Sequence, residues 1–279
     1  GVEIIKRLLA RKGLGRLQGT LIAVPIVNVF GFNTNSRYLP DRRDLNRCFP
    51  GSEKGSLASL VAHIFMTEIV SKCTHGIDLH TGAIHRTNMP QIRAQLDNAE
   101  TSQLAESFGV PIIVNSTTRD GSLRQAASDI GVSMLLYEGG EALRYEDKVI
   151  QTGLHGIISV MRSIGMLPGV FRPSRKLGKH VFVADSSFWV RAPASGSLSV
   201  KTKPGSRVSE GDILGVLSDP YGESQVEVIA PRTGIVIGMT MIPLVNRGDG
   251  LFHIAVFNDS AAVEERIEEF AEESHQFLK

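Results

Sequence analysis

Apolar residues along the first 166 positions fall into blocks of two alternating kinds. Nearly continuous apolar runs predict strands at 20–29, 110–115 and 132–138, and we also interpret the run HGIDLH at 75–80 as a strand. Apolar residues spaced three and four apart predict helices, at the start of the chain and at 56–73, 100–108, 122–130 and 146–164. Strands that alternate with helices indicate an α/β fold with a mainly parallel or mixed sheet flanked by helices. Ligands of such folds bind beyond the carboxyl ends of the strands.

The helical pattern stops after Pro168, and a segment rich in proline and basic residues follows. We place the domain boundary near 170–178 and interpret the basic stretch Arg172, Arg175, Lys176 and Lys179 as a solvated connector. The chain is therefore divided into a larger α/β domain at 1–170, a smaller all-β domain at 171–259 and a terminal helix at 260–279.

The β-rich region contains an internal near-repeat. The pattern A-P-x-x-G followed by V-x-x-G-D begins at Ala192 and again at Ala230. Two copies predict two similar β-hairpin units that pack against each other. The pattern resembles biotinyl/lipoyl-type barrels or sandwiches, but the segment SDPYGESQVEV between the copies has none of the lysine that a carrier domain needs. We therefore expect a structural or site-covering module.

Composition excludes several classes of protein. Apolar residues make up 42% of the 279 residues, charged residues 21%, and the net charge is +1, which does not favour nucleic acid as a partner. No apolar run has the roughly 18 residues of a membrane helix, and no signal segment is present, so we expect a cytoplasmic protein. Cys48 and Cys73 are too few for a disulfide framework. The sequence is compatible with a homo-oligomer.

Three segments concentrate polar chemistry where predicted strands end. Asp78-Leu79-His80-Thr81-Gly82 places a histidine at the end of an apolar strand, a position that suits a zinc ligand. The loop from Arg37 to Arg47 carries four arginines and Asn46, which favours binding of a carboxylate. Glu138 leaves an apolar strand at the turn Gly139-Gly140, which suits a general base.

Over residues 1–166, these segments resemble the succinylglutamate desuccinylase/aspartoacylase family, which has a zinc carboxypeptidase-like fold. The resemblance rests on R-D-L-N-R-C-F-P-G, I-D-L-H-T-G and Y-E-G-G. It implies a zinc-dependent hydrolase that cleaves the amide bond of a small N-acyl amino acid. His80 would then be a zinc ligand and Glu138 the base that activates water. Residues implied to contact substrate are Arg37 or Arg43 at the scissile carbonyl, Asn46 and Arg47 at the carboxylate, and Arg124 at the acyl or amino-acid end.

The chain departs from the family in one motif. The family takes its other two zinc ligands from H-x-x-E, and no H-x-x-E occurs in this sequence. We expect the motif upstream of Gly1, with one zinc per intact chain; the alternative is a protein that has lost the metal. Two rival functions follow: a metal-free carboxylate-binding protein, and a metallocarboxypeptidase that acts on peptides.

Overall fold

The computed structural model describes residues 1–116, 120–169 and 181–276. The helices are α1 (Val2–Leu9), α2 (Val29–Asn33), α3 (Leu57–Glu68), α4 (Ala99–Phe108), α5 (Leu123–Asp129), α6 (Asp147–Ser163) and α7 (Ser260–Gln276), with 3₁₀ turns at Lys12–Arg16, Leu45–Arg47 and Val70–Lys72. The first strands are β1 (His75–Gly82), β2 (Arg86–Ala94), β3 (Ile112–Asn115) and β4 (Ser133–Glu141). The later strands are β5 (Phe182–Ala184), β6 (Ser186–Arg191), β7 (Gly196–Val200), β8 (Arg207–Val208), β9 (Ile213–Ser218), β10 (Gln225–Ile229), β11 (Gly234–Thr240), β12 (Leu244–Val245) and β13 (Gly250–Val256).

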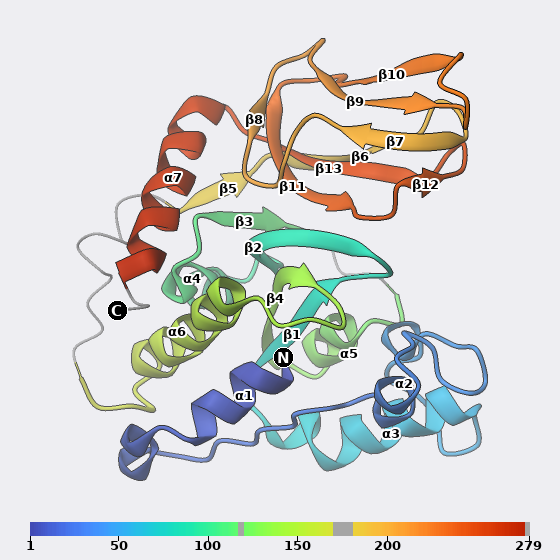
Figure 1. Ribbon diagram of the computed structural model, residues 1–279. Helices are drawn as coiled ribbons and strands as arrows, with labels where there is room; N and C mark the ends of the chain where they lie inside the picture. The colour runs from blue at the N-terminus through green and yellow to red at the C-terminus, as the bar shows by residue number, and fades with distance from the viewer. Residues whose placement is uncertain (117–119, 170–180, 277–279) are drawn as a thin grey trace.

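One mixed sheet of nine strands runs through the described part of both regions (Figure 1). Its main path is β1-β4-β2-β11-β13-β6, in which β1 and β4 are parallel and β2 is antiparallel to both β4 and β11. The end of β2 also pairs with β3, and β3 with β5. Five C-terminal strands, β5, β6, β8, β11 and β13, therefore extend the same sheet that carries His80 and Glu138.

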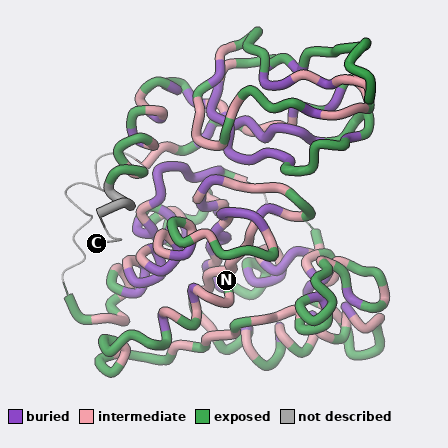
Figure 2. The backbone as a smooth tube through the Cα atoms, viewed as in Figure 1, coloured by how far each residue is buried: buried purple, intermediate pink, exposed green. Residues whose placement is uncertain are grey.

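Helices cover both faces of the N-terminal part of this sheet. On one face, α1, α4 and α6 pack against Ile92, Leu135 and Tyr137. On the other face, a second cluster joins α3 and α5 around Leu45 and Ala127. Figure 2 shows the resulting band of buried backbone along the central strands. Strands that are covered by helices on both faces are buried on both sides, which explains the apolar runs of β3 and β4 in the sequence.

The structure corrects the strand predicted at 20–29. Residues 20–28 form no strand, and α2 begins at Val29. Pro25 has no amide hydrogen to donate to a ladder, and the apolar side chains serve separate cores, with Leu21 against the first cluster and Val27 against the second. The segment is an extended connector between the two cores.

The predicted strands and helices from residue 56 onward are present with small shifts of their ends, and β2 is an addition. The helix predicted over 56–73 ends at Glu68 and is followed by a 3₁₀ turn at Val70–Lys72. The predicted linker at 170–178, with Arg172, Arg175, Lys176 and Lys179, lies outside the described residues. No helix in the described residues is long and apolar enough to span a membrane.

The near-repeat produces matched backbone contacts in the C-terminal region. The Ala192 N–H donates to Asp249 O and the Ala230 N–H to Asp212 O, each at 2.9 Å. In both copies the aspartate of V-x-x-G-D accepts from the backbone N–H three residues earlier. Each copy's A-P segment thus pairs with the other copy's G-D turn. These units build a separate four-stranded sheet, β10-β9-β7-β12, whereas β5, β6, β8, β11 and β13 of the same region belong to the nine-stranded sheet, so the predicted all-β region shares a sheet with the N-terminal region.

Phe108 fills the core between α4, α6 and the sheet. It is 3% exposed and stacks on Tyr137 with ring centroids 5.2 Å apart. We expect Phe108→Ala to lower the free energy of unfolding by about 3–5 kcal/mol, because the change leaves a cavity. Chemical denaturation of this variant and of Glu106→Ala, on the exposed face of the same helix, measures the effect. Equal stabilities of the two variants would contradict the packing described.

Candidate functional site

His80 and Glu138 lie side by side at the carboxyl ends of two parallel strands. The two residues are register partners of β1 and β4, so both side chains point to the same face of the sheet. Gln91 of β2 is the partner of Glu138 on its other side. The two residues that the sequence placed at separate strand ends are thus brought together.

The Glu138 carboxylate is held from β2. Asn88 Nδ2 donates to Glu138 Oε2 at 2.8 Å, and Arg93 Nε lies 3.9 Å from Glu138 Oε1. The Glu138 side chain is 14% exposed. Each carboxylate oxygen therefore has a polar neighbour, and the group remains open enough to meet a substrate.

His80 is oriented by a carboxylate on its own strand. His80 Nε2 lies 2.9 Å from Asp78 Oδ2. Burial opposes the charged imidazole, but Asp78 and Glu138 outweigh it and raise the pKa of His80 to about 9. Burial likewise opposes the charged form of Asp78, but His80 and Arg124 outweigh it and the pKa of Asp78 lies below its ordinary value. The Asp78 bond directs Nε2 away and leaves Nδ1 as the nitrogen available to a metal ion.

The arginines of the 37–47 loop differ in their surroundings. Arg37 is fixed by Asp44, whose Oδ2 accepts from its Nε at 3.1 Å and from its Nη2 at 2.8 Å. Its charge opposes protonation of His80, which places it within electrostatic reach of the site. Arg43 and Arg47 are exposed. The structure therefore fixes the guanidinium of Arg37 and leaves those of Arg43 and Arg47 at the surface.

The same loop docks on the start of α5. Asn46 Oδ1 accepts from Leu123 N at 2.9 Å, and Phe49 N donates to Gly121 O at 3.0 Å. Gly121 has φ +75°, and a Cβ there would lie 2.5 Å from Arg47 O. This docking occupies the Asn46 side-chain oxygen and leaves its NH₂ group for another acceptor.

Asn46 provides a test of this docking. We expect Asn46→Ala to lower the free energy of unfolding by about 1–3 kcal/mol, because the N–H of buried Leu123 loses its acceptor. Asn46→Asp keeps an acceptor oxygen and should retain most of the stability, while its negative charge weakens carboxylate binding. Thermal unfolding of both variants measures the difference, and equal destabilisation would contradict the assigned bond.

Arg124 lies near the same site, whereas His75 does not. Arg124 Nη1 donates to Ser116 Oγ at 3.1 Å, and its charge acts on Asp78. His75 lies at the opposite end of β1, where its Nε2 is 3.3 Å from Glu100 Oε1. Arg124 therefore remains a candidate for substrate contact, and His75 is a structural residue.

The residues described do not complete a metal site on their own. Within the described ranges, no three histidine, cysteine or acidic side chains cluster as metal ligands. His80 supplies one suitable imidazole.

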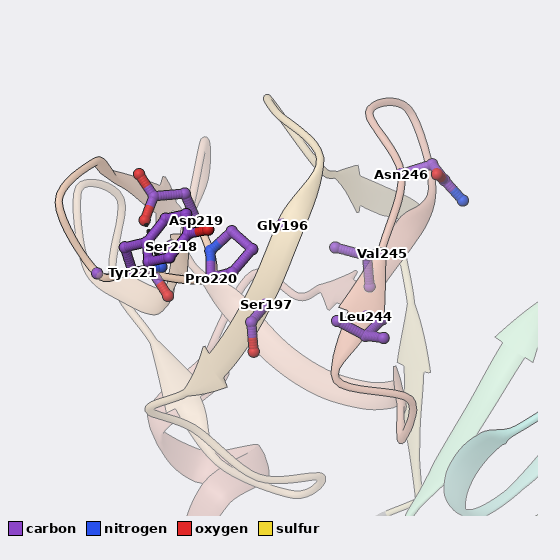
Figure 3. Close-up of a pocket in the computed structure, with 10 residues that line it drawn as sticks. Gly196, Ser197, Ser218, Asp219, Pro220, Tyr221, Leu244, Val245 and Asn246 are labelled. Atoms are coloured by element: carbon purple, nitrogen blue, oxygen red, sulfur yellow. Dashed lines mark hydrogen bonds between the residues drawn. The ribbon is translucent and has the colours of Figure 1, made fainter.

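A cavity of about 710 Å³ lies elsewhere, in the small four-stranded sheet (Figure 3). It is lined by the turn 218–222 and by parts of β7 and β12. Asp219 holds this turn by accepting from the N–H groups of Tyr221, Glu223 and Ser224. The turn thus carries an internally bonded aspartate at the place where a carrier domain would present lysine.

The sequence of residues 1–164 matches the protein-family model of the succinylglutamate desuccinylase/aspartoacylase catalytic domain. The chain belongs to this family. One relative in the comparisons is the N-α-acetyl-L-2,4-diaminobutyric acid deacetylase of Halomonas elongata, 25% identical over 265 residues that cover 91% of this chain and 78% of the relative.

Solved structures share the fold of this family member. The product-bound ectoine utilization protein EutE (DoeB) from Ruegeria pomeroyi matches with a TM-score of 0.83 at 24% identity, over 92% of this chain and 81% of that one. A succinylglutamate desuccinylase/aspartoacylase from Rhodobacter sphaeroides matches with a TM-score of 0.81 at 24% identity and the same coverage. Both matches extend beyond residue 164, so the C-terminal region belongs to the shared fold.

Two neighbours of Glu138 in this family member were not predicted from the sequence. Neither Asn88 nor Arg93 was assigned a role in catalysis or substrate binding. Both lie on β2, which Pro90 and a register shift between Asn88 and Gln91 disguise in sequence. The alternation of Gln91 and Arg93 with buried Ile92 and Ala94 was the available signal.

Proposed function

We propose that this protein is a zinc-dependent hydrolase that cleaves the amide bond of a small N-acyl amino acid. The observation that carries the proposal is the Glu138 carboxylate, held by Asn88 beside His80 at the carboxyl edge of the sheet. Family membership supports a deacylase. The Halomonas elongata relative is by name a deacetylase of an N-acetyl amino acid, which supports this substrate class.

The polar loop suits a substrate with a free carboxylate. The Asn46 NH₂ group and the exposed Arg47 offer donors to that carboxylate, and exposed Arg43 is a further candidate donor. Arg37, fixed by Asp44, is assigned to the scissile carbonyl oxygen. Arg124 is assigned to the acyl or amino-acid end.

Glu138 handles the proton in the proposed reaction. It accepts a proton from water while the water oxygen bonds to the acyl carbon, and the carbonyl electron pair moves to the oxygen beside Arg37. The carbon–nitrogen bond then breaks as the carbonyl forms again, and Glu138 returns the proton to the leaving amine nitrogen. The products are a carboxylic acid and a free amino acid.

The proposal assigns His80 as one ligand of a zinc ion. A bound zinc ion would lower the pKa of the attacking water. Because the described residues supply one imidazole and no complete site, the proposal takes the remaining ligands from outside the described residues.

Zinc content tests this proposal. Elemental analysis at neutral pH compares residues 1–279, the chain extended upstream to its natural start, and His80→Ala in the extended chain. We expect about one zinc per extended chain and much less in the other two proteins. Absence of zinc from all three would overturn the metal-dependent mechanism, and the arginine loop would then be tested as a metal-free carboxylate site.

A further inference from the structure

We propose that the C-terminal strands β11 and β13 position the Glu138 carboxylate, with Gly238 and His253 as positioning residues that act through β2. This inference rests on the proposed role of Glu138 as the base. Both residues lie outside the stretch 1–164 that the family model matches. According to this proposal, the C-terminal region helps to position a residue of the active site.

The first path runs from β11 through Asn88. In register, Asn88 is the partner of Gly140 on β4 and of Gly238 on β11. A Cβ on Gly238 would lie 2.4 Å from Asn88 Oδ1, closer than real carbon and oxygen atoms approach. The glycine therefore leaves the space in which the Asn88 amide lies and from which it donates to Glu138 Oε2.

The second path runs from β13 through Arg93. Arg93 Nη2 lies 3.3 Å from His253 Nδ1, and Arg93 Nε lies 3.9 Å from Glu138 Oε1. A guanidinium has only donors, so His253 Nδ1 is the acceptor and the ring proton lies on Nε2. One arginine thus connects a histidine 160 positions away in sequence with the proposed base.

The His253 ring is itself held in place. It is 4% exposed and stacks on Trp189 of β6, with centroids 4.8 Å apart and planes 8° apart. The guanidinium of Arg86 covers the Trp189 ring, 4.8 Å from its centroid. This packing limits rotation of the imidazole and fixes the acceptor that Arg93 meets.

The two paths hold opposite oxygens of one carboxylate. Asn88 contacts Oε2 and Arg93 lies by Oε1, while the C-terminal strands contact both of these residues. A base must point at the proton that it accepts, and a small misplacement lowers the rate without loss of binding. Disturbing β11 or β13 should therefore change kcat more than KM.

Steady-state kinetics of the full-length protein with N-acetyl-L-2,4-diaminobutyrate tests the second path. We expect His253→Leu, which removes the acceptor, to lower kcat by about 10- to 100-fold with little change in KM. His253→Asn keeps an acceptor and should recover most of the activity. Zinc content and thermal unfolding of each variant are measured alongside. Equal kcat for His253→Leu and the unaltered protein would overturn the proposal.

A double-mutant cycle separates positioning from general support of the fold. In an Arg93→Met background, His253→Leu should lower kcat little further, because the link to Glu138 is already broken. If the double variant lost kcat by the product of the two single-variant factors, His253 would act independently of Arg93. Gly238→Ala tests the first path and keeps the His253 side chain: we expect a lower kcat, and a normal kcat would overturn that path even if His253→Leu fails to fold.

Glu138→Gln in the same assay distinguishes failure of this inference from failure of the proposed function. Normal turnover by Glu138→Gln would remove the base itself and the proposed function with it. Loss of turnover in Glu138→Gln, together with normal kcat in His253→Leu and Gly238→Ala, would overturn the positioning role alone.

Discussion

Glu138→Gln is expected to lower kcat by about 10²–10⁴-fold, the usual contribution of a general base. The amide has nearly the shape of the carboxylate and keeps an oxygen that can accept from Asn88 Nδ2. It cannot take a proton from water at neutral pH. Zinc content and stability should therefore remain normal while turnover is lost, as steady-state kinetics and elemental analysis measure.

Glu106→Gln is the matched control for this change. Glu106 is exposed on α4, and its neutralisation should leave kcat unaltered. If Glu138→Gln retained near-normal turnover with full zinc, Glu138 would not be the base. If it lost zinc as well, the residue would be required for the metal site.

Arg37→Met is expected to lower kcat/KM by about 10²–10³-fold, the effect of removing one donor from a developing oxyanion. Arg37 is held through two nitrogens by Asp44, so its charge is already in place when the substrate binds. Methionine retains much of the apolar stem but carries no charge. Kinetics with a good N-acyl amino acid measures the loss.

Two arginines of the same loop serve as comparisons. Arg42→Met removes an exposed charge that has no assigned role and should leave kcat/KM nearly unchanged. Arg43→Met should raise KM more than it lowers kcat, because Arg43 is exposed and, unlike Arg37, is assigned to substrate binding only. A larger loss of kcat in Arg43→Met than in Arg37→Met would exchange the two roles.

The local spacing of apolar residues was sufficient to predict the helices and strands that bury at least one full face in the core. β4 carries a nearly continuous apolar run because helices cover both faces of the sheet at that strand. α3 and α6 begin at the expected positions because their apolar stripes are regular. The segment 20–29 has the same apolar character and forms no strand, because strand formation depends on a partner that the sequence alone does not identify.

The residues of the candidate site likewise differ in whether the sequence could predict them. His80 and Glu138 could be recognised because each is a polar residue that closes an apolar strand. Asn88 and Arg93 could not, since they lie on a strand interrupted by Pro90 and a register shift. The contact of His253 with Arg93 spans 160 positions and depends on how β13 joins the sheet, which no local pattern encodes.

Hydrolysis of N-acyl amino acids by the full-length, zinc-loaded protein tests the proposed function most directly. Release of the free amine from a panel that includes N-acetyl-L-2,4-diaminobutyrate, N-acetylaspartate, N-succinylglutamate and a short peptide is measured beside Glu138→Gln. We expect at least one small N-acyl amino acid to yield amine and acid in equal amounts, the peptide to yield little, and Glu138→Gln to be inactive. No amine release from any N-acyl amino acid, or preferred cleavage of the peptide, would contradict the proposed function.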